Sequence, residues 1–119
     1  MFFRRVPDGG GYAIIAGVEQ LIQYIKNLKF DKDDIEYLRN KNLFSEEFLK
    51  YLSNFKFSCD IWSVEEGTPI FPMKPIIIVK GPVIEAQFIE TMLLLTINHQ
   101  SLISEKLWNL KEKILYNIK

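Results

Sequence analysis

The pattern of apolar and polar positions predicts three short helices early in the chain, a β-rich middle and one long helix at the end. Apolar residues at helical spacing predict a first helix from Val18 to near Leu28. Asp31 and Ser45 precede two further stretches with the same periodicity. Short acceptor side chains satisfy the free amides of a first helical turn, so we expect these two residues to act as N-caps.

Runs of β-forming residues lie on both sides of these helices. Residues 1–5 and 12–16 flank a glycine-rich segment at 7–11, which predicts a hairpin. Further strands are predicted at residues 57–64, 68–71 and 76–80, with turns at 65–67 and 72–75. The unbroken apolar run at 76–79 is typical of a strand covered on both faces.

A long helix is predicted from Gly81-Pro82 to the end of the chain, because no Gly or Pro follows Pro82. Its roughly 36 residues would span about 54 Å, whereas a compact domain of this size has a radius of gyration near 13 Å. We therefore expect the helix to bend near residues 98–101 or to extend past its own core toward a surface that this chain lacks. Up to Ile103 the helix is apolar nearly all round, which indicates burial between layers.

Beyond Lys106 the same helix becomes amphipathic. One apolar stripe is predicted there, suited to covering the core or to pairing with a second copy; its residues are Leu107, Leu110, Ile114 and Ile118.

Composition and charge exclude several classes of protein. Fifteen basic residues balance fifteen acidic ones among 119, so broad electrostatic attraction to nucleic acid or to anionic membrane is not expected. Cys59 is the single cysteine, and no Cys/His cluster has the spacing of a zinc site. The start lacks a signal-peptide core, and the longest apolar stretch, residues 92–97, is too short to span a bilayer. These features favour a cytoplasmic protein without membrane, nucleic acid or metal partners.

Few residues are candidates for chemistry. Arg4 and Arg5 precede the glycine-rich segment, where guanidinium groups and exposed amides would suit a phosphate; a tight turn without a ligand is the alternative. His99 has no Ser or Cys partner placed by a motif, and Glu85 and Glu90 are five positions apart, so they do not share a helix face. We therefore predict no catalytic residue, and the residues alone indicate an α+β domain.

Several stretches, taken in order, carry a family resemblance. They are residues 2–14, 16–17, 34–38, 44–49, Glu66-Gly67-Thr68, Phe71-Pro72, Pro75, Gly81-Pro82, 85–87, 90–91 and 97–98. Their order and spacing over residues 2–106 resemble the N-terminal part of the nicotinate phosphoribosyltransferases.

The resemblance implies a fold and a reaction. The fold is the N-terminal α/β sandwich-type domain of a type II phosphoribosyltransferase, with residues 1–119 as one partial domain and the helix at 82–119 leading toward a barrel that is absent. The reaction joins nicotinate and phosphoribosyl pyrophosphate into nicotinate mononucleotide in NAD salvage, coupled to ATP hydrolysis, with Mg²⁺ on the diphosphate. In the family a later barrel carries the phosphorylated histidine, which His99 does not match.

The resemblance also implies a homodimer and one site. Arg4 matches a position that faces phosphates across the dimer interface, and Arg5 is a weaker candidate. We expect this chain alone to be inactive and to bind no cofactor.

Departures from the family pattern leave two alternatives open. A tyrosine-bearing segment is missing before Phe2, and the chain departs from the family after Lys106, as expected for a truncated or frameshifted reading frame. One alternative is another type II phosphoribosyltransferase, such as the quinolinate enzyme. The other is a free-standing, non-enzymatic domain that dimerises through the stripe at 107–118.

Overall fold

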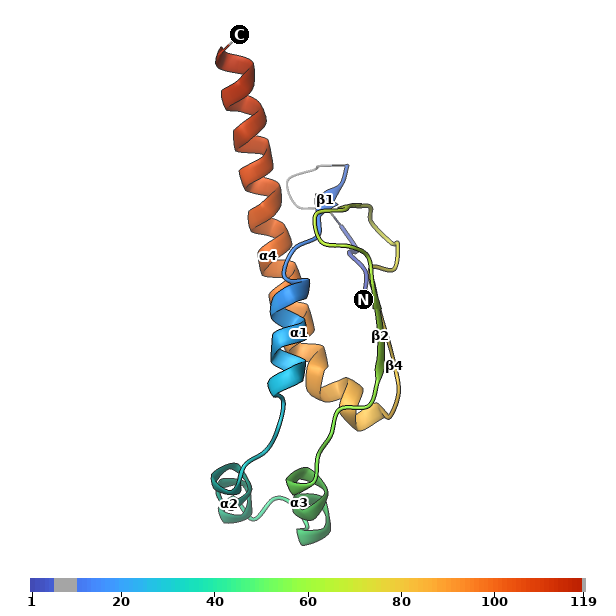
Figure 1. Ribbon diagram of the computed structural model, residues 1–119, viewed down its shortest axis with the longest axis vertical. Helices are drawn as coiled ribbons and strands as arrows, with labels where there is room; N and C mark the ends of the chain where they lie inside the picture. The colour runs from blue at the N-terminus through green and yellow to red at the C-terminus, as the bar shows by residue number, and fades with distance from the viewer. Residues whose placement is uncertain (6–10, 119) are drawn as a thin grey trace.

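The computed structural model describes residues 1–5 and 11–118 and shows the expected α+β architecture (Figure 1). Its elements are β1 (Ala13–Ile14), α1 (Val18–Asn27), α2 (Lys32–Asn40), α3 (Glu46–Ser53), β2 (Asp60–Ser63), β3 (Pro69–Ile70), β4 (Ile77–Lys80) and α4 (Val83–Ile118). Helices α1 and α4 lie beside the strands, and α2 and α3 form a separate pair at the end opposite the C-terminus. The predicted elements are therefore present, except that residues 1–5 form only an isolated bridge at Phe2, and the strands are shorter than expected.

Both predicted N-caps are confirmed. The Asp31 carboxylate accepts hydrogen bonds from the amides of Asp33 and Asp34 at 3.1 and 3.0 Å, while Asp34 accepts one from the Asp31 amide at 3.0 Å. The two amide bonds to the Asp31 carboxylate stabilise its ionised form, the one from Asp34 most of all, and hold the pKa of Asp31 below its ordinary value. The Ser45 hydroxyl accepts from the Phe48 amide at 3.3 Å. Short polar side chains thus set where α2 and α3 begin.

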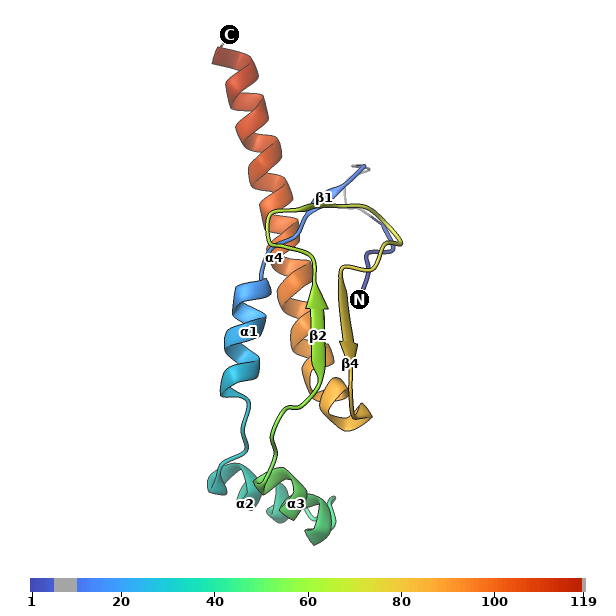
Figure 2. The same cartoon turned by 45° about the vertical axis from the view of Figure 1, so that its right-hand side comes forward.

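The strands form two antiparallel ribbons. β2 pairs with β4 so that Ile61 faces Val79, and Figure 2 shows these two strands side by side. β1 pairs with β3 so that Ala13 faces Ile70. That ladder continues beyond the strands, because the Ile15 amide donates to the Thr68 carbonyl at 3.1 Å.

The hairpin predicted around the glycine-rich segment is wrong. Phe2 bridges to Pro75, and the Phe3 carbonyl accepts from the Met73 amide at 2.7 Å, so the N-terminal segment pairs with residues 73–77. Residues 12–16 pair instead with β3 and its flanks. The backbone groups of both segments are satisfied by a distant stretch of the chain, which local patterning does not reveal. Residues 6–10 of the glycine-rich segment lie outside the described part.

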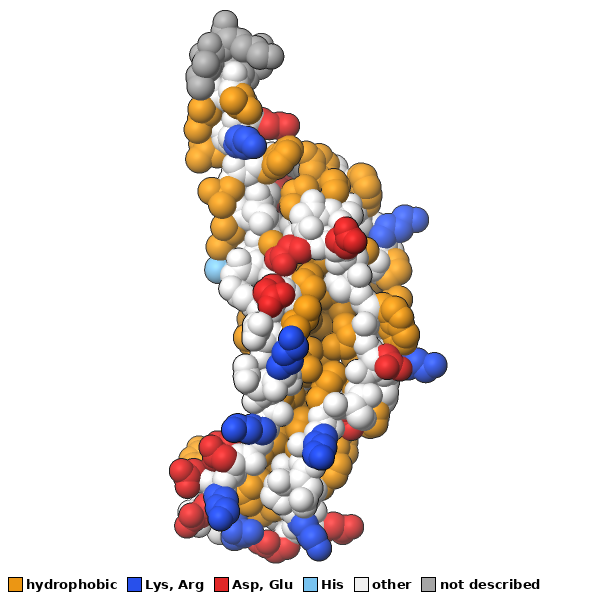
Figure 3. Space-filling view, in the orientation of Figure 1, with side chains coloured by type: hydrophobic (Ala, Val, Ile, Leu, Met, Phe, Trp, Pro, Cys, Tyr) orange, Lys and Arg blue, Asp and Glu red, His pale blue; other side chains and the backbone are white. Residues whose placement is uncertain are grey.

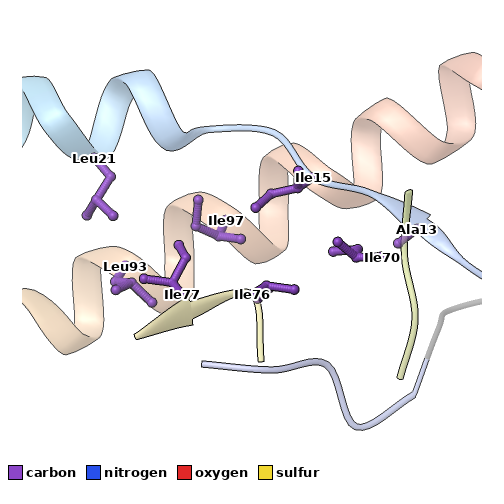
Figure 4. Packing of buried hydrophobic residues seen from close by; sticks show 8 residues of the cluster. All are labelled: Ala13, Ile15, Leu21, Ile70, Ile76, Ile77, Leu93 and Ile97. Atoms are coloured by element: carbon purple, nitrogen blue, oxygen red, sulfur yellow. The ribbon is translucent and has the colours of Figure 1, made fainter. Parts of the chain in front are cut away.

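Two apolar clusters hold the elements together. The larger packs α1, α4 and the strands around Ala13, Ile15, Leu21, Ile70, Ile76, Ile77, Leu93 and Ile97 (Figure 4). The smaller consists of buried Ile35, Leu49 and Leu52 between α2 and α3. Phe88 of α4 joins the two parts, because its ring centroid lies 5.4 Å from those of Phe30 and Phe55.

The strand at residues 76–79 is covered on one face only, contrary to the prediction. Ile77 is fully buried, whereas Ile78 is 51% exposed and lies opposite Trp62, which is 53% exposed. α4 covers the inner face of the β2–β4 ribbon, and no element in the described part of the chain covers the outer face. One residue of the continuous apolar run, Ile78, therefore forms an exposed apolar pair with Trp62.

Helix α4 runs without interruption for 36 residues and extends past the rest of the molecule, as predicted (Figures 1 and 2). The molecule measures 65 × 25 × 22 Å, with a Cα radius of gyration of 18.6 Å. Residues 98–101 are regular helix, and it is the first turns of α4 that are inclined to the remainder. The bend expected at 98–101 is therefore wrong, and the extension is the alternative that the structure supports.

The first part of α4 is buried on one side rather than all round. Ile89 and Ile97 are fully buried, but Leu95 is 64% exposed and Leu94 is 40% exposed. Among the described residues, no further layer covers the apolar side chains on its outer side. Within residues 1–5 and 11–118, α4 included, no helix combines the length and the hydrophobicity that crossing a membrane requires.

Candidate functional site

The predicted site residues Arg4 and Arg5 lie on the surface, directly after the pairing between Phe3 and Met73. Both side chains are exposed. In the described part of the chain no carboxylate lies within 4.0 Å of either guanidinium, since the one ion pair found there joins Arg39 to Glu46. Each guanidinium thus presents its N–H donors to solvent, an arrangement open to a phosphate or carboxylate.

The predicted phosphate site also included the glycine-rich segment at residues 7–11, of which the structure describes only Gly11. A Cβ added there would meet nothing within 4 Å, so this backbone is open to solvent. The remainder of the predicted phosphate loop, Pro7 to Gly10, lies outside the described residues. The phosphate loop stays a prediction.

One of the resemblance motifs, Glu66-Gly67-Thr68, forms a packing junction. Glu66 accepts a hydrogen bond from the Gly17 amide at 2.6 Å, which places a carboxylate at the N-terminus of α1. The neighbouring Ala16 amide donates to the Ser101 hydroxyl of α4 at 3.1 Å. Gly17 has a φ of 98°, and a Cβ there would lie 3.0 Å from the Thr96 methyl group. These residues fix α1 against α4.

The second junction joins the segment before β2 to the start of α4. Glu85 is only 6% exposed and accepts from the Ser58 amide at 2.5 Å and from the Ser58 hydroxyl at 3.0 Å. At Gly81, an added Cβ would lie 2.8 Å from the Cys59 Cα, so only glycine allows the two backbones to come this close. The Gly81-Pro82 motif and Glu85 therefore hold the segment before β2 against the start of α4.

Cys59 is a poor nucleophile at this junction. Burial, and then the negative charge of Glu85, raise the pKa of its thiol above the ordinary value. The reactive thiolate is correspondingly scarce near neutral pH.

The remaining candidates are not brought together. Glu85 is buried whereas Glu90 is exposed on the same helix, and His99 is exposed further along it. Among residues 1–5 and 11–118, no three His, Cys, Asp or Glu side chains are grouped so as to hold a metal ion.

An apolar hollow of about 450 Å³ between the β1–β3 ladder and α4 was missed by sequence reasoning. It is lined by Tyr12, Ile14, Gly67, Pro69, Phe71 and Trp108. These residues come from three distant segments, so only their apolar character was visible in the sequence. The hollow shows that Trp108 faces the body of the molecule.

Comparison with known proteins gives one consistent family. Residues 1–98 match the family model described as the nicotinate phosphoribosyltransferase (NAPRTase) N-terminal domain. The chain is 40% identical over 106 residues to a nicotinate phosphoribosyltransferase of Mycobacterium tuberculosis, which covers 89% of this chain and 23% of that protein. It is 41% identical over 111 residues to the nicotinate phosphoribosyltransferase of Bacillus subtilis, covering 93% and 23% respectively.

A solved structure agrees with these matches. The crystal structure of human nicotinic acid phosphoribosyltransferase superposes with a TM-score of 0.81 at 28% identity, over 88% of this chain and 22% of that one. The chain thus spans less than a quarter of the length of these relatives.

Proposed function

Because the chain belongs to the nicotinate phosphoribosyltransferase family, whose N-terminal domain it matches, we propose that it supplies the scaffold domain of an enzyme that joins nicotinate to phosphoribosyl pyrophosphate. In that reaction the ring nitrogen of nicotinate forms a bond to the ribose carbon, and pyrophosphate leaves with the electrons of the bond that breaks. The product is nicotinate mononucleotide, and ATP hydrolysis drives its formation. The family match over residues 1–98 carries this proposal.

In the proposed role, this chain positions other parts of the enzyme and contributes no reacting group. The resemblance motifs resolved here form hydrogen-bonded or close-packed junctions, such as Glu66 with Gly17 and Glu85 with Ser58. In the described part, the acidic side chains are not grouped so as to hold a metal ion, and the proposed role assigns no contact with Mg²⁺ or ATP to these residues. We accordingly propose that the 119-residue chain alone is inactive.

A chimera tests the scaffold role. Residues 1–98 would replace the matched segment of the Bacillus subtilis relative, which is 41% identical to this chain. We expect the folded chimera to make nicotinate mononucleotide and the isolated chain to make none. Activity of the isolated chain, or a folded chimera without activity, would contradict the proposal.

Within that role, we propose that Arg4, with Arg5 in support, binds the diphosphate of phosphoribosyl pyrophosphate in the active site of a partner subunit. The exposure of both guanidinium groups and the absence of a nearby carboxylate in the described chain support this assignment. Arg4→Ala in the chimera should raise KM for phosphoribosyl pyrophosphate about tenfold, the effect of losing one charge-assisted contact. Arg39→Ala, which removes an exposed arginine on α2, is the matched control, and an unchanged KM in Arg4→Ala would reject the role.

We also propose that the enzyme is a homodimer, because the Arg4 role requires a second subunit. We propose the cytoplasm as its location, because a chain with a single, free cysteine suits a reducing compartment. A free-standing dimerisation domain is the second candidate, and the exposed apolar residues at the end of α4 favour it. Light scattering on the isolated chain separates the two, because a specific dimer that depends on Leu107 and Leu110 is expected only of the second.

A further inference from the structure

The part of α4 that extends past the body carries an apolar stripe on its outer side. We define this terminal stripe as Ile103, Leu107, Leu110 and Ile114, which are 40%, 61%, 55% and 50% exposed. The intervals of four, three and four residues place them on one face of a helix. Trp108 lies on another side and lines the hollow against Tyr12 and Pro69, so the stripe faces away from the body. Figure 3 shows apolar side chains along the outer edge of this part of the molecule.

Lysines flank the terminal stripe on both sides. At about 100° per residue, Lys106 and Lys113 lie along one flank and Lys111 along the other, while Glu112 is on the opposite side of the helix. In the described chain none of these lysines has a carboxylate within 4.0 Å, and the Lys111 ammonium lies 5.6 Å from the centre of the Trp108 ring. The stripe is therefore bordered by positive charge that nothing in the described chain neutralises.

This charge pattern argues against a second copy as the occupant. Two terminal stripes packed face to face would bring the lysine flanks together, since Lys106, Lys111 and Lys113 occupy the positions that border a helix–helix seam. Like charges there oppose pairing. Leu115 and Trp108, which are 53% and 43% exposed, lie toward the side of the helix that faces the body, so the outward face carries only the four stripe residues, the width of a helix–helix seam.

We propose that the terminal stripe docks an amphipathic helix of a partner protein. The apolar stripe of that partner helix is flanked by Asp and Glu. Carboxylates on the partner would meet Lys106, Lys111 and Lys113 at the rim, while apolar side chains cover Leu107 and Leu110 at the centre. The stripe lies beyond residue 98, where the match to the family model ends, and the proposed function assigns no role to it.

A pair of synthetic peptides tests the proposal on the full chain. Both are 21-residue helices with Leu and Ile at the seam; one carries Glu at the flanking positions and the other carries Lys. Fluorescence anisotropy of labelled peptide should show the Glu peptide binding at least about tenfold more tightly at low salt, because several exposed ion pairs add small increments. The difference should shrink in 1 M salt. Equal affinities for the two peptides, or no binding of either, would overturn the proposal.

Variants of the chain decide whether the stripe is the site. The triple substitution Lys106→Glu, Lys111→Glu and Lys113→Glu should reverse the preference toward the Lys peptide. Leu107→Ser with Leu110→Ser should abolish binding, whereas Leu43→Ser, at a 77% exposed leucine between α2 and α3, should leave it unchanged. Glu-peptide binding retained in the double-serine chain would overturn the proposal. So would a stripe-dependent self-dimer, or tighter stripe-dependent binding to phosphatidylserine vesicles than to the Glu peptide.

Discussion

Gly17 and Gly67 both adopt left-handed backbone angles, with φ of 98° and 85°, but neighbouring side chains enclose only Gly17. A Cβ at Gly17 would lie 3.0 Å from Thr96 and 3.1 Å from Gln100, whereas one at Gly67 meets nothing within 4 Å. Gly67 therefore provides a control with the same backbone requirement and no steric one.

We predict that Gly17→Ala destabilises the chain more than Gly67→Ala does. Gly67→Ala should cost about 1 kcal/mol in the free energy of unfolding, because alanine disfavours positive φ. Gly17→Ala should cost at least about 1 kcal/mol more, because α1 must also move away from α4. Urea denaturation measures both, and equal losses would show that the contact with Thr96 does not constrain the junction.

At the second junction, Glu85 stabilises the chain and suppresses the thiol beside it. Glu85→Gln should cost about 1–3 kcal/mol in the free energy of unfolding, because one amide oxygen replaces a carboxylate that accepts from both the Ser58 amide and hydroxyl. Removing the charge should also lower the pKa of the Cys59 thiol. That pKa should stay above its ordinary value, because the thiol remains buried.

Alkylation rates of the folded chain across pH measure that pKa. Glu90→Gln, on an exposed side of α4, is the control and should change neither quantity. A thiol pKa unaffected by Glu85→Gln would contradict the assigned contact.

At the scale of single elements, the cap of α2 makes stability depend on pH. The folded-state pKa of Asp31 is lowered, so its contribution is present above the unfolded-state pKa of about 4 and is lost as the pH falls through the folded-state value. Asp31→Asn should retain a capping acceptor at pH 7 but lose less stability than wild type between pH 7 and pH 3. Asp31→Ala should be less stable than both at pH 7. Urea midpoints at the two pH values provide the test, and identical pH dependence in wild type and Asp31→Asn would disprove it.

The helices were predictable from sequence because their signals are local. Asp31 and Ser45 cap their own helices, and the absence of Gly or Pro after Pro82 is enough to predict the length of α4. Strand pairing was not predictable, because Phe2 bonds across more than seventy positions to the Pro75 region and local patterning favoured a hairpin instead.

Burial was predictable only where the covering layer belongs to this chain. The apolar runs at 76–79 and in the first part of α4 indicated two-sided burial, yet Ile78 and Leu95 are exposed. For the candidate site, the sequence placed Arg4 and Arg5 directly before a glycine-rich segment, whereas their exposure and the hollow lined by Trp108 required the fold.

At the scale of the whole molecule, the shape is extended. A compact chain of this length would have a radius of gyration near 13 Å. Small-angle scattering of the monomer should instead give a value close to the 18.6 Å of the structure, because α4 projects past the body. A value near 13 Å would mean that the end of α4 folds back onto the strands.

The uninterrupted length of α4 beyond its last anchored turn gives its C-terminal end a long reach. Ser101 is fully buried and accepts a hydrogen bond from the Ala16 amide, and the end of the helix at Ile118 lies about 25 Å further along. A rotation of about 10° at Ser101 would move that end by roughly 4 Å over that length. A molecule bound to the end of α4 would therefore be displaced by a small rearrangement of the contact between α1 and α4.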